Sequence, residues 1–323
     1  MYDIITIGAA TRDVFLVSDK FIAIKSKKFP TGAGECVALG SKIEVGELVL
    51  TTGGGATNAA ATFGRLGFRT ATICRVGDDS PGKDVVEELS RFNVSTHLVR
   101  MIKKGETAYS TILTMKDGER TVLVYRGTSS EFVTRDIPDT ALKNTKWIYL
   151  TSLGGNLGIA KKIITTAHKA GVKIAWNPGH KELESGFKTF APLLPFVDVL
   201  NMNLEEAILL TGKKQLPDMF ALLHADGLVR LITDGTNGAT VYRDGWMAHA
   251  QTTGVKSVSR TGAGDAFGSG FVAGLMKTDD LKESLRVGMV NAESVILSYG
   301  AKRGIIRDWP STLKKRQVKI SVL

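Results

Sequence analysis

The chain has 323 residues, of which 43% are hydrophobic and 23% are charged, and its formal net charge is +10. This composition is typical of a globular protein with a sizeable core, and the length suits a large α/β domain with an accessory part. The basic residues are spread along the chain without an interleaved aromatic stripe. We therefore do not expect a nucleic-acid-binding protein, but a lysine-rich surface that favours anionic small molecules.

The sequence has the features of a cytoplasmic protein. The first residues, MYDIITIG, lack a basic segment and predict a first strand instead of a signal peptide. No apolar run approaches the roughly 18 residues that a membrane-spanning helix needs. Cys36 and Cys74 form no CxxC pair and the five histidines are scattered, which disfavours a disulfide framework and a protein-held zinc site. We expect a cytoplasmic protein that does not contact a membrane.

Apolar, β-rich runs alternate with helical patterns along the chain. The first run covers 2–8, and five more follow at 68–77, 146–152, 171–177, 196–203 and 227–233. The helical patterns between them include PGKDVVEELSRF, IAKKIITTAHKA and LEEAILLTG. Strands that alternate with helices predict an α/β fold, with a mostly parallel sheet covered by helices on both faces.

Two stretches interrupt this alternation. Residues 14–52 and 105–128 contain short segments in which polar and apolar residues alternate, and the second carries Asp117-Gly118 between two strands, which is typical of a β-hairpin. We expect these stretches to form a small separate sheet, a lid over the main part. Because no repeat or low-complexity linker is visible, residues 1–323 are expected to form a single domain.

The glycine-rich stretches exclude several nucleotide-binding and hydrolytic sites. A phosphate-binding P-loop needs Ser or Thr after its Gly-Lys pair, but the pairs at 82–83 and 212–213 are followed by Asp84 and Lys214. The segment GAATRD at 8–13 lacks the three-glycine spacing of a dinucleotide fold. The GxSxG pattern of a serine hydrolase is absent.

The remaining glycine-rich stretch, RTGAGDAFGSGFVAGL at 260–275, predicts an anion site. Gly262, Ala263 and Gly264 leave backbone N–H groups uncovered ahead of a helical pattern, and a helix N-terminus attracts anions. Asp265 could simply cap this helix, but a cap does not explain the many glycines, each of which costs roughly 1 kcal/mol inside a helix. A carboxylate beside such amides is suited to take the proton from a hydroxyl that attacks a phosphoryl group.

The motif TGAGDAFGSGFVAGL at 261–275 resembles the C-terminal signature of the ribokinase-like, or phosphofructokinase B type, carbohydrate kinases, a family of sugar and nucleoside kinases. Three further segments resemble family motifs in the family's order: GGGATNAAATFGRLG at 53–67, VGDDSPG at 76–82 and NLEEA at 203–207. The resemblance implies a ribokinase-like three-layer αβα fold with a small β-sheet lid. It also implies an ATP-dependent kinase that uses Mg²⁺.

The resemblance assigns roles to residues on the catalytic and acceptor side. Asp265 corresponds to the catalytic base, and the amides of 262–264 correspond to its anion hole. Asp13, Gly54 and Asn58 match positions that contact the sugar. Asn58 could instead cap a helix and Asp13 could bind loop amides, but a polyol needs a carboxylate and an amide as partners, so we favour the acceptor role.

The resemblance also assigns roles on the nucleotide side. Asn203 and Glu206 would position the water shell of Mg²⁺, although Asn-x-x-Glu before AILL is also the pattern of a capping box. Thr233 and Gly235 would contact the phosphates, and Asn291 would lie near the adenine pocket. We interpret the segment 76–82 as chiefly structural.

One departure from the family pattern concerns a monovalent cation. The family usually has an aspartate and a threonine where this chain has Ser259 and Arg260, and that aspartate helps to hold an activating cation. Its loss puts cation activation in doubt, although backbone carbonyls of the loop 300–304 could still hold an ion. Arg260 would instead supply positive charge near the phosphates.

The sequence therefore predicts a kinase that transfers the γ-phosphoryl group of ATP to a primary hydroxyl of a sugar or nucleoside, with the lid excluding water. One alternative is a kinase of phosphorylated sugars, with Arg12 and Arg126 as anion contacts. Another is a catalytically inactive nucleotide- or sugar-sensing protein, against which the intact Asp265 argues. The expected partner is a small-molecule acceptor, with a homodimer through the lid as a further expectation.

Overall fold

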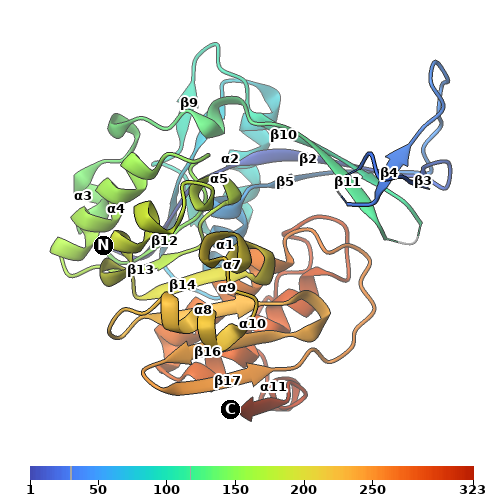
Figure 1. Cartoon of the computed structure of the whole chain (residues 1–323). Helices are drawn as coiled ribbons and strands as arrows, with labels where there is room; N and C mark the ends of the chain where they lie inside the picture. The colour runs from blue at the N-terminus through green and yellow to red at the C-terminus, as the bar shows by residue number, and fades with distance from the viewer. Residues whose placement is uncertain (30, 117) are drawn as a thin grey trace.

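The computed structural model, which describes residues 1–29, 31–116 and 118–323, is built around a ten-stranded sheet (Figure 1). Its strand order is β18-β17-β16-β15-β14-β13-β12-β1-β6-β8. In chain order the strands are β1 (Tyr2–Ile7), β6 (Thr70–Ile73), β8 (Val94–Ser95), β12 (Thr145–Leu150), β13 (Lys173–Trp176), β14 (Val199–Asn203), β15 (Val229–Thr233), β16 (Ala239–Arg243), β17 (Trp246–Ala250) and β18 (Ile320–Val322).

The predicted, mostly parallel sheet is confirmed. The strands from β8 to β15 pair in parallel, whereas β16, β17 and β18 continue the sheet in antiparallel pairing. All six predicted runs contain a strand of this sheet, and the run 68–77 is divided between β6 and β7 (Arg75–Gly77). The antiparallel edge was not predicted from the sequence pattern.

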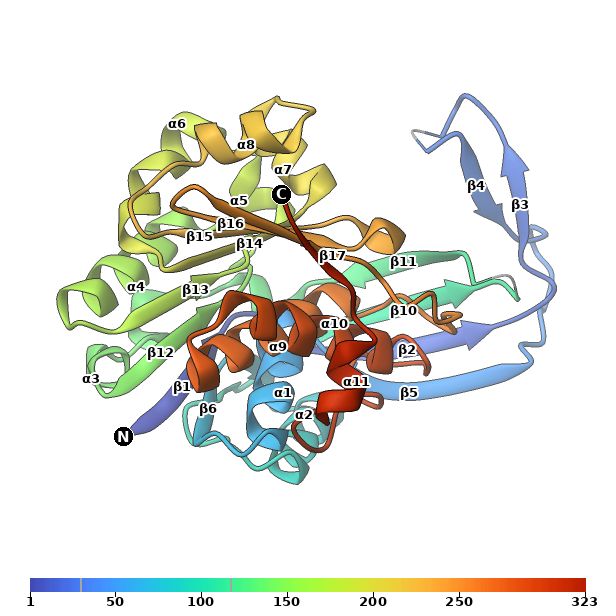
Figure 2. The same cartoon turned by 90° about the horizontal axis from the view of Figure 1, so that it is seen from below.

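Helices cover both faces of the sheet, as Figure 2 shows. Successive residues of a strand point to opposite faces, so Ile4 packs in one core and Ile5 in the other. The core with Ile4 includes side chains of α1 (Gly55–Arg65), α9 (Ala263–Thr278) and α10 (Leu281–Val295). The core with Ile5 includes side chains of α4 (Leu157–Lys169), α7 (Leu204–Thr211) and α8 (Leu216–Leu222).

The other helices are α2 (Ser80–Arg91), α3 (Asp139–Lys143), α5 (His180–Leu183), α6 (Phe187–Phe190) and α11 (Thr312–Arg316). The segment 76–82 shapes the start of α2, where the Asp79 side chain caps the helix by accepting a hydrogen bond from the Gly82 N–H at 2.8 Å. In the part of the chain that the structure describes, no helix combines the length and the apolar composition that crossing a membrane requires.

A separate four-stranded sheet extends from one side of the main body (Figures 1 and 2). Its order is β11-β10-β2-β5, with β2 (Thr11–Val17), β5 (Glu47–Gly53), β10 (Ala108–Thr114) and β11 (Arg120–Tyr125). A short pair, β3 (Ile22–Lys25) and β4 (Ala33–Cys36), lies at its far end, and β7 pairs with β9 (Arg100–Ile102) near the main sheet. We call the four-stranded sheet the lid.

The lid contains strands from both predicted segments, although β3 and β4 within 14–52 pair separately. The antiparallel pairing of β10 with β11 confirms the hairpin in 105–128, while Asp117 of its Asp-Gly pair lies outside the described residues. The first lid strand begins at Thr11, three residues before the predicted boundary at 14. Because β2 follows β1 after only three residues, the lid is attached directly to an interior strand of the main sheet.

Candidate active site

The start of α9 has the backbone geometry that the glycine-rich motif predicts. Gly262 precedes the helix in a left-handed conformation, with φ 82° and ψ 0°. A Cβ at Gly262 would lie 2.7 Å from the Cα of Ala301, so both the backbone conformation and the packing require glycine. A Cβ at Gly264 would meet no atom within 4 Å, and the space beside this residue belongs to two cavities. The first amides of α9 thus border open space, as an anion site requires.

The carboxylate of Asp265 binds a side chain from another helix. Its Oδ2 accepts a hydrogen bond from Nδ2 of Asn58 on α1 at 2.8 Å. The N-cap of α9 is Gly262, which has no side chain, and among the described residues the Asp265 side chain bonds to Asn58 and not to an amide of the helix start. The capping role considered for Asp265 is therefore not the one observed. Burial raises the pKa of Asp265, while the hydrogen bond from Asn58 and the charge of Lys302 act in the opposite direction. The arrangement suits a group that accepts a proton.

Asn58 is a buried residue of α1 and does not cap that helix. The N-cap is Gly54, and Asn58 lies one turn further on, where its backbone N–H bonds to the Gly54 carbonyl at 2.9 Å. The capping alternative for Asn58 is therefore wrong. Its Oδ1 is buried and has no hydrogen-bond partner among the described residues, so one acceptor of this amide is left for a ligand.

Asp13 lies on β2, near the point where the lid joins the main sheet. Its side chain is buried, and its Oδ1 accepts a hydrogen bond from the Thr11 hydroxyl at 2.8 Å. Burial raises the pKa of Asp13. A Cβ at Gly53 would lie 1.9 Å from Asp13 Oδ2, and Gly54 has φ 97° and packs against the Ala9 carbonyl. The paired glycines therefore make room for Asp13 and for the turn into α1.

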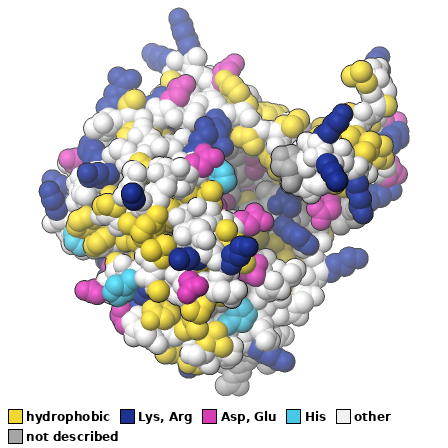
Figure 3. All heavy atoms as spheres, viewed as in Figure 1, with side chains coloured by type: hydrophobic (Ala, Val, Ile, Leu, Met, Phe, Trp, Pro, Cys, Tyr) yellow, Lys and Arg dark blue, Asp and Glu magenta, His cyan; other side chains and the backbone are white. Residues whose placement is uncertain are grey.

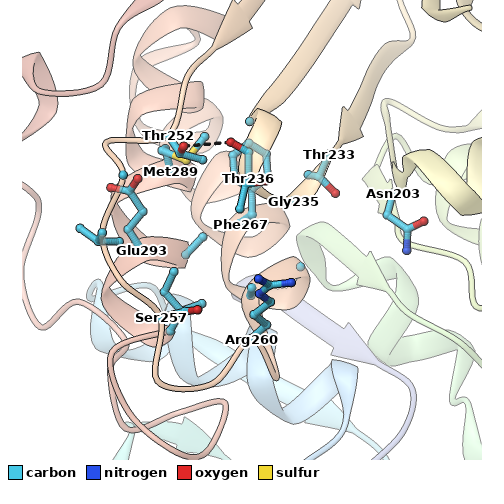
Figure 4. A pocket seen from close by; sticks show the side chains of 17 residues that line it. Asn203, Thr233, Gly235, Thr236, Thr252, Ser257, Arg260, Phe267, Met289 and Glu293 are labelled. Carbon is cyan, nitrogen blue, oxygen red and sulfur yellow. Dashed lines mark hydrogen bonds between the residues drawn. The ribbon is translucent and has the colours of Figure 1, made fainter. Parts of the chain in front are cut away.

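A cavity of about 460 Å³ lies beside the start of α9 (Figure 4). Its apolar wall includes Val255, Phe267, Met289, Ala292 and Ile296, and its polar residues include Asn203, Thr233, Thr236 and Arg260. Three predicted nucleotide contacts, Asn203, Thr233 and Gly235, line this cavity together with Ala263 and Gly264. An apolar pocket that ends at backbone amides and an arginine fits a base followed by phosphates.

Asn291, predicted to lie near the adenine pocket, adjoins Ala292 on α10 but does not itself line this cavity. Its side chain is fully buried, and Nδ2 donates to the Thr62 hydroxyl at 3.2 Å and to the Ala266 carbonyl at 2.8 Å. Its Oδ1 accepts from the N–H of Ile306 at 3.2 Å. This amide joins α10 to α1, α9 and a following loop, and Met289, from the same helix, lines the cavity instead.

A second cavity, of about 210 Å³, connects Asp265 with the start of α7. Asn203 and Glu206 form a capping box there, because Asn203 Oδ1 accepts from Glu206 N–H at 2.8 Å and Glu206 Oε2 accepts from Asn203 N–H at 2.9 Å. The capping box that the motif also predicted is therefore present, and the role of the motif in binding Mg²⁺ stays a prediction. Burial and the charge of Asp265 raise the pKa of Glu206.

The same cavity offers oxygen donors for a divalent cation. Glu206 and Asp265 both line it, together with the amides Asn177, Asn201 and Asn203. Among the described residues no three His, Cys, Asp or Glu side chains form a metal-binding group. One or two carboxylates plus substrate phosphates and water are how proteins usually bind Mg²⁺, so the donor set fits an ion held through water.

Two arginines considered in the sequence analysis differ in their surroundings. Arg12 pairs with Asp84 at 2.6 Å, so a contact with an acceptor phosphate would compete with this ion pair. Arg126 is exposed. Arg260 is also exposed and lines the larger cavity beside Ala263 and Gly264, where its charge faces the expected position of phosphates.

Lys302 is a residue near the site that the sequence analysis missed. It is 0% exposed, and its Nζ donates hydrogen bonds to the carbonyl and the hydroxyl of Thr52, each at 2.8 Å. Glu88 Oε2 lies 3.6 Å from this Nζ. In the sequence, Lys302 precedes Arg303 in a glycine-rich loop, and such a basic pair usually indicates an exposed turn.

The chain is similar to known proteins in sequence and in fold. The chain is 30% identical over 236 residues to an ATP-dependent ribose-1-phosphate kinase of Halopiger xanaduensis, covering 72% of this chain and 76% of the relative. The fold matches an adenosine kinase from Sinorhizobium meliloti with a TM-score of 0.76 and 24% identity, covering 93% of this chain and 95% of the other. It also matches an Arabidopsis thaliana ribokinase complexed with ribose and ATP, with a TM-score of 0.77, 20% identity, and coverage of 97% and 98%.

The model of the pfkB family of carbohydrate kinases matches residues 1–307, and these residues include the lid, the start of α9 and both cavities. The chain therefore belongs to the pfkB family of carbohydrate kinases and is a phosphotransferase that acts on an alcohol group.

Proposed function

We propose that this protein transfers the γ-phosphoryl group of ATP to a primary hydroxyl of a sugar or nucleoside. The observation that carries the proposal is the position of Asp265. Its carboxylate does not cap α9, lies beside the uncovered amides of that helix, and is bonded to Asn58 on the acceptor side. A base next to an anion site is the arrangement that phosphoryl transfer to a hydroxyl requires.

In the proposed reaction Asp265 takes the proton of the acceptor hydroxyl as its oxygen attacks the γ-phosphorus. The new O–P bond forms while the bond from the γ-phosphorus to the bridging oxygen breaks, and ADP leaves. The amides of Gly262, Ala263 and Gly264 stabilise the negative charge that develops on the transferred group. Asn58 orients the carboxylate through the 2.8 Å hydrogen bond.

The nucleotide would occupy the 460 Å³ cavity, with its base against Phe267 and Met289 and its phosphates towards Thr233 and Arg260. Mg²⁺ would neutralise part of the phosphate charge when bound. Glu206 and Asn203 would position its water shell from the neighbouring cavity, although each also contributes to the capping box of α7. Asn291 is not part of this proposal.

The acceptor would bind between Asp13, Gly54 and Asn58, on the other side of Asp265. Asp13 offers a buried carboxylate and Asn58 an unpaired Oδ1, and together they can accept hydrogen bonds from two hydroxyls. A phosphorylated sugar is the second candidate, because the relative from Halopiger xanaduensis is named a ribose-1-phosphate kinase. The pairing of Arg12 with Asp84 disfavours it, since one of the two expected phosphate contacts is already engaged.

We also propose a cytoplasmic homodimer that forms through the lid. The edge strands β5 and β11 carry exposed apolar side chains, among them Leu48, Leu50, Val122 and Val124, whose relative exposures range from 44% to 57%. Apolar residues gathered on an open sheet edge favour association with another surface. Size-exclusion chromatography with light scattering tests the dimer, and Val122→Lys should convert it to monomer.

The decisive experiment measures ATP consumption by the purified protein with a panel of pentoses, hexoses, sugar phosphates and nucleosides. Turnover with an unphosphorylated sugar or nucleoside supports the proposal, and turnover only with sugar phosphates supports the second candidate. Tight nucleotide or sugar binding without turnover by any acceptor would instead indicate a sensing protein on this fold.

A further inference from the structure

The loop 300–304 places the ammonium group of Lys302 inside the protein. Both hydrogen bonds from its Nζ go to Thr52 of β5, and the Thr52 hydroxyl also bonds to the Glu88 carboxylate of α2. Glu88 lies 3.6 Å from the same Nζ. A fully buried lysine is rare unless it is paired. Burial lowers the pKa of Lys302, and the carboxylates of Glu88, Asp13 and Asp265 act in the opposite direction, so these contacts favour a positive charge at a defined position.

This position connects the two sides of the site. Thr52 precedes Gly53, which packs directly on the Asp13 carboxylate. Ala301, next to Lys302, packs against Gly262 at the start of α9. The loop therefore contacts both the strand that carries the acceptor side and the helix start that carries Asp265.

We propose that Lys302 is a positioning residue, whose fixed positive charge holds the carboxylates of Asp13 and Asp265 together in one site. The inference rests on the proposed kinase function, in which both carboxylates take part. Asp13 is buried, and Asp265 is half-buried beside the smaller cavity. Two such carboxylates repel each other, and a cation near them offsets that repulsion. Lys302 lines neither of the two cavities, so it acts through the carboxylates and does not contact substrate.

Arg260 does not serve as the cation that offsets the repulsion between these carboxylates. It is exposed and faces the nucleotide cavity, whereas Lys302 is enclosed between β5, α2 and the loop 300–304. The charge of Lys302 lowers the pKa of both Asp13 and Asp265 against the larger effect of burial. Losing that charge should make both carboxylates harder to ionise.

The other titratable groups around these carboxylates do not replace the cation. Lys302 faces Glu88 and Cys74, and burial raises the pKa of the Cys74 thiol to about 12, so that thiol is neutral. Asp265 faces Glu206 on α7 and Tyr149 on β12. Burial raises the pKa of the Tyr149 phenol, which therefore also stays neutral. Among the described residues, the other charged groups that act on Asp13 and Asp265 are carboxylates, so removal of Lys302 leaves an excess of negative charge.

The test compares Lys302→Ala, which removes the charge and leaves space, with Lys302→Met, which removes the charge and fills the space. Both variants should lose about 10- to 100-fold in kcat. In a plot of kcat/KM against pH, the acid limb of both variants should shift to higher pH by about 0.5 unit or more. Ammonium or methylammonium chloride, at constant ionic strength, should restore at least about fivefold of the lost activity in Lys302→Ala only. The unmodified protein should not respond.

A purely structural lysine gives a different result. Activity would then fall equally at every pH and ammonium would not restore it, or the variants would keep the activity and the acid limb of the unmodified protein. Either result overturns the inference. If the single variants do not fold, the double variant Glu88→Gln/Lys302→Met removes both charges of the pair. It should fold and still show the shifted acid limb, and full activity with an unshifted limb would also overturn the inference.

A thermal-shift measurement separates this inference from the kinase assignment. Ammonium should raise the Tm of Lys302→Ala more than that of Lys302→Met, and this readout needs no substrate. If the unmodified protein phosphorylates no acceptor while this difference in Tm is observed, the proposed function fails and the internal cation site stands. If the protein is an active kinase and the difference is absent, the inference about Lys302 fails alone.

Discussion

Asn58 and Asp265 are 207 residues apart in the chain and are joined by a hydrogen bond of 2.8 Å from Nδ2 to Oδ2. Asn58 comes from the first helix after the lid strand β5, and Asp265 from the first turn of α9. The contact brings a motif from each half of the chain to one point. The proposed base also lines the smaller cavity, together with Glu206.

Asp265→Asn should lower kcat by about 10² to 10⁴, because the amide keeps the size of the side chain and a hydrogen-bonding group but cannot accept the proton. ATP binding, measured by calorimetry, should change little, since the amides of α9 and the cavity walls remain. Asp265→Glu is the matched variant that keeps the base but moves it. If Asp265→Asn retained most of the turnover, Asp265 would not be the base.

The same substitution should stabilise the protein at neutral pH. Burial raises the pKa of Asp265 in the folded state, so the ionised carboxylate costs free energy of folding at pH 7, and this cost disappears as the pH falls through the raised pKa. We expect Asp265→Asn to raise the Tm by roughly 2–4 °C at pH 7, with a smaller difference near pH 4. A Tm difference that grew towards acid pH would contradict the sign of this pKa shift.

The sequence predicted the parts of the fold and the site that depend on local pattern. Strand and helix periodicity indicated the parallel sheet, and the glycines around Asp265 indicated a helix start open to an anion. The antiparallel strands β16, β17 and β18 were not predicted. They form the edge of the sheet, and β18 pairs with a strand about 70 residues earlier in the chain.

The sequence did not predict the directions of individual side chains that depend on tertiary packing. Asn291 and Met289 lie on the same helix, but only the packing of α10 against α1 and α9 determines that Asn291 points into the protein while Met289 lines the cavity. Lys302 is similar, because its burial depends on Thr52 and Glu88 from two distant elements. No spacing in the sequence carries that information.

Asp13→Ala should raise the KM for the acceptor at least about tenfold and leave the KM for ATP within about twofold, because a lost hydroxyl contact costs about 1–3 kcal/mol on one side of the site only. Steady-state kinetics with each substrate varied in turn provides the measurement. Thr11→Val is a useful control, since it removes the 2.8 Å hydrogen bond to Asp13 but keeps the carboxylate. Equal increases in both KM values would indicate a structural role for Asp13.

Asn291→Ala should destabilise the protein by about 2–4 kcal/mol, because the substitution leaves the buried Ile306 N–H and Ala266 carbonyl without their partner. Urea unfolding at a temperature where the variant is folded measures this loss. The KM for ATP of the folded variant should stay close to that of the unmodified protein. Met289→Ala is the matched change on the same helix, and it should raise the KM for ATP with a smaller loss of stability.

The last prediction concerns potassium and follows from Ser259 and Arg260. A K⁺ ion needs a ring of oxygen ligands, and a carboxylate in that ring offsets much of the cost of removing its water. Ser259 is buried but offers only a neutral hydroxyl, which accepts a hydrogen bond from the Thr261 N–H at 3.3 Å. Arg260 adds a positive charge one residue away that repels a bound cation.

We therefore expect the rate at saturating Mg²⁺ and ATP to change by less than about twofold when K⁺ replaces a large organic cation at constant ionic strength. Arg260→Thr should lower the activity, because it removes positive charge from the phosphate end of the cavity. Ser259→Asp combined with Arg260→Thr should make the rate depend on K⁺, because the carboxylate then contributes a charged ligand. A several-fold activation of the unmodified protein by K⁺ would show that carbonyls of the loop 300–304 bind the ion without any carboxylate.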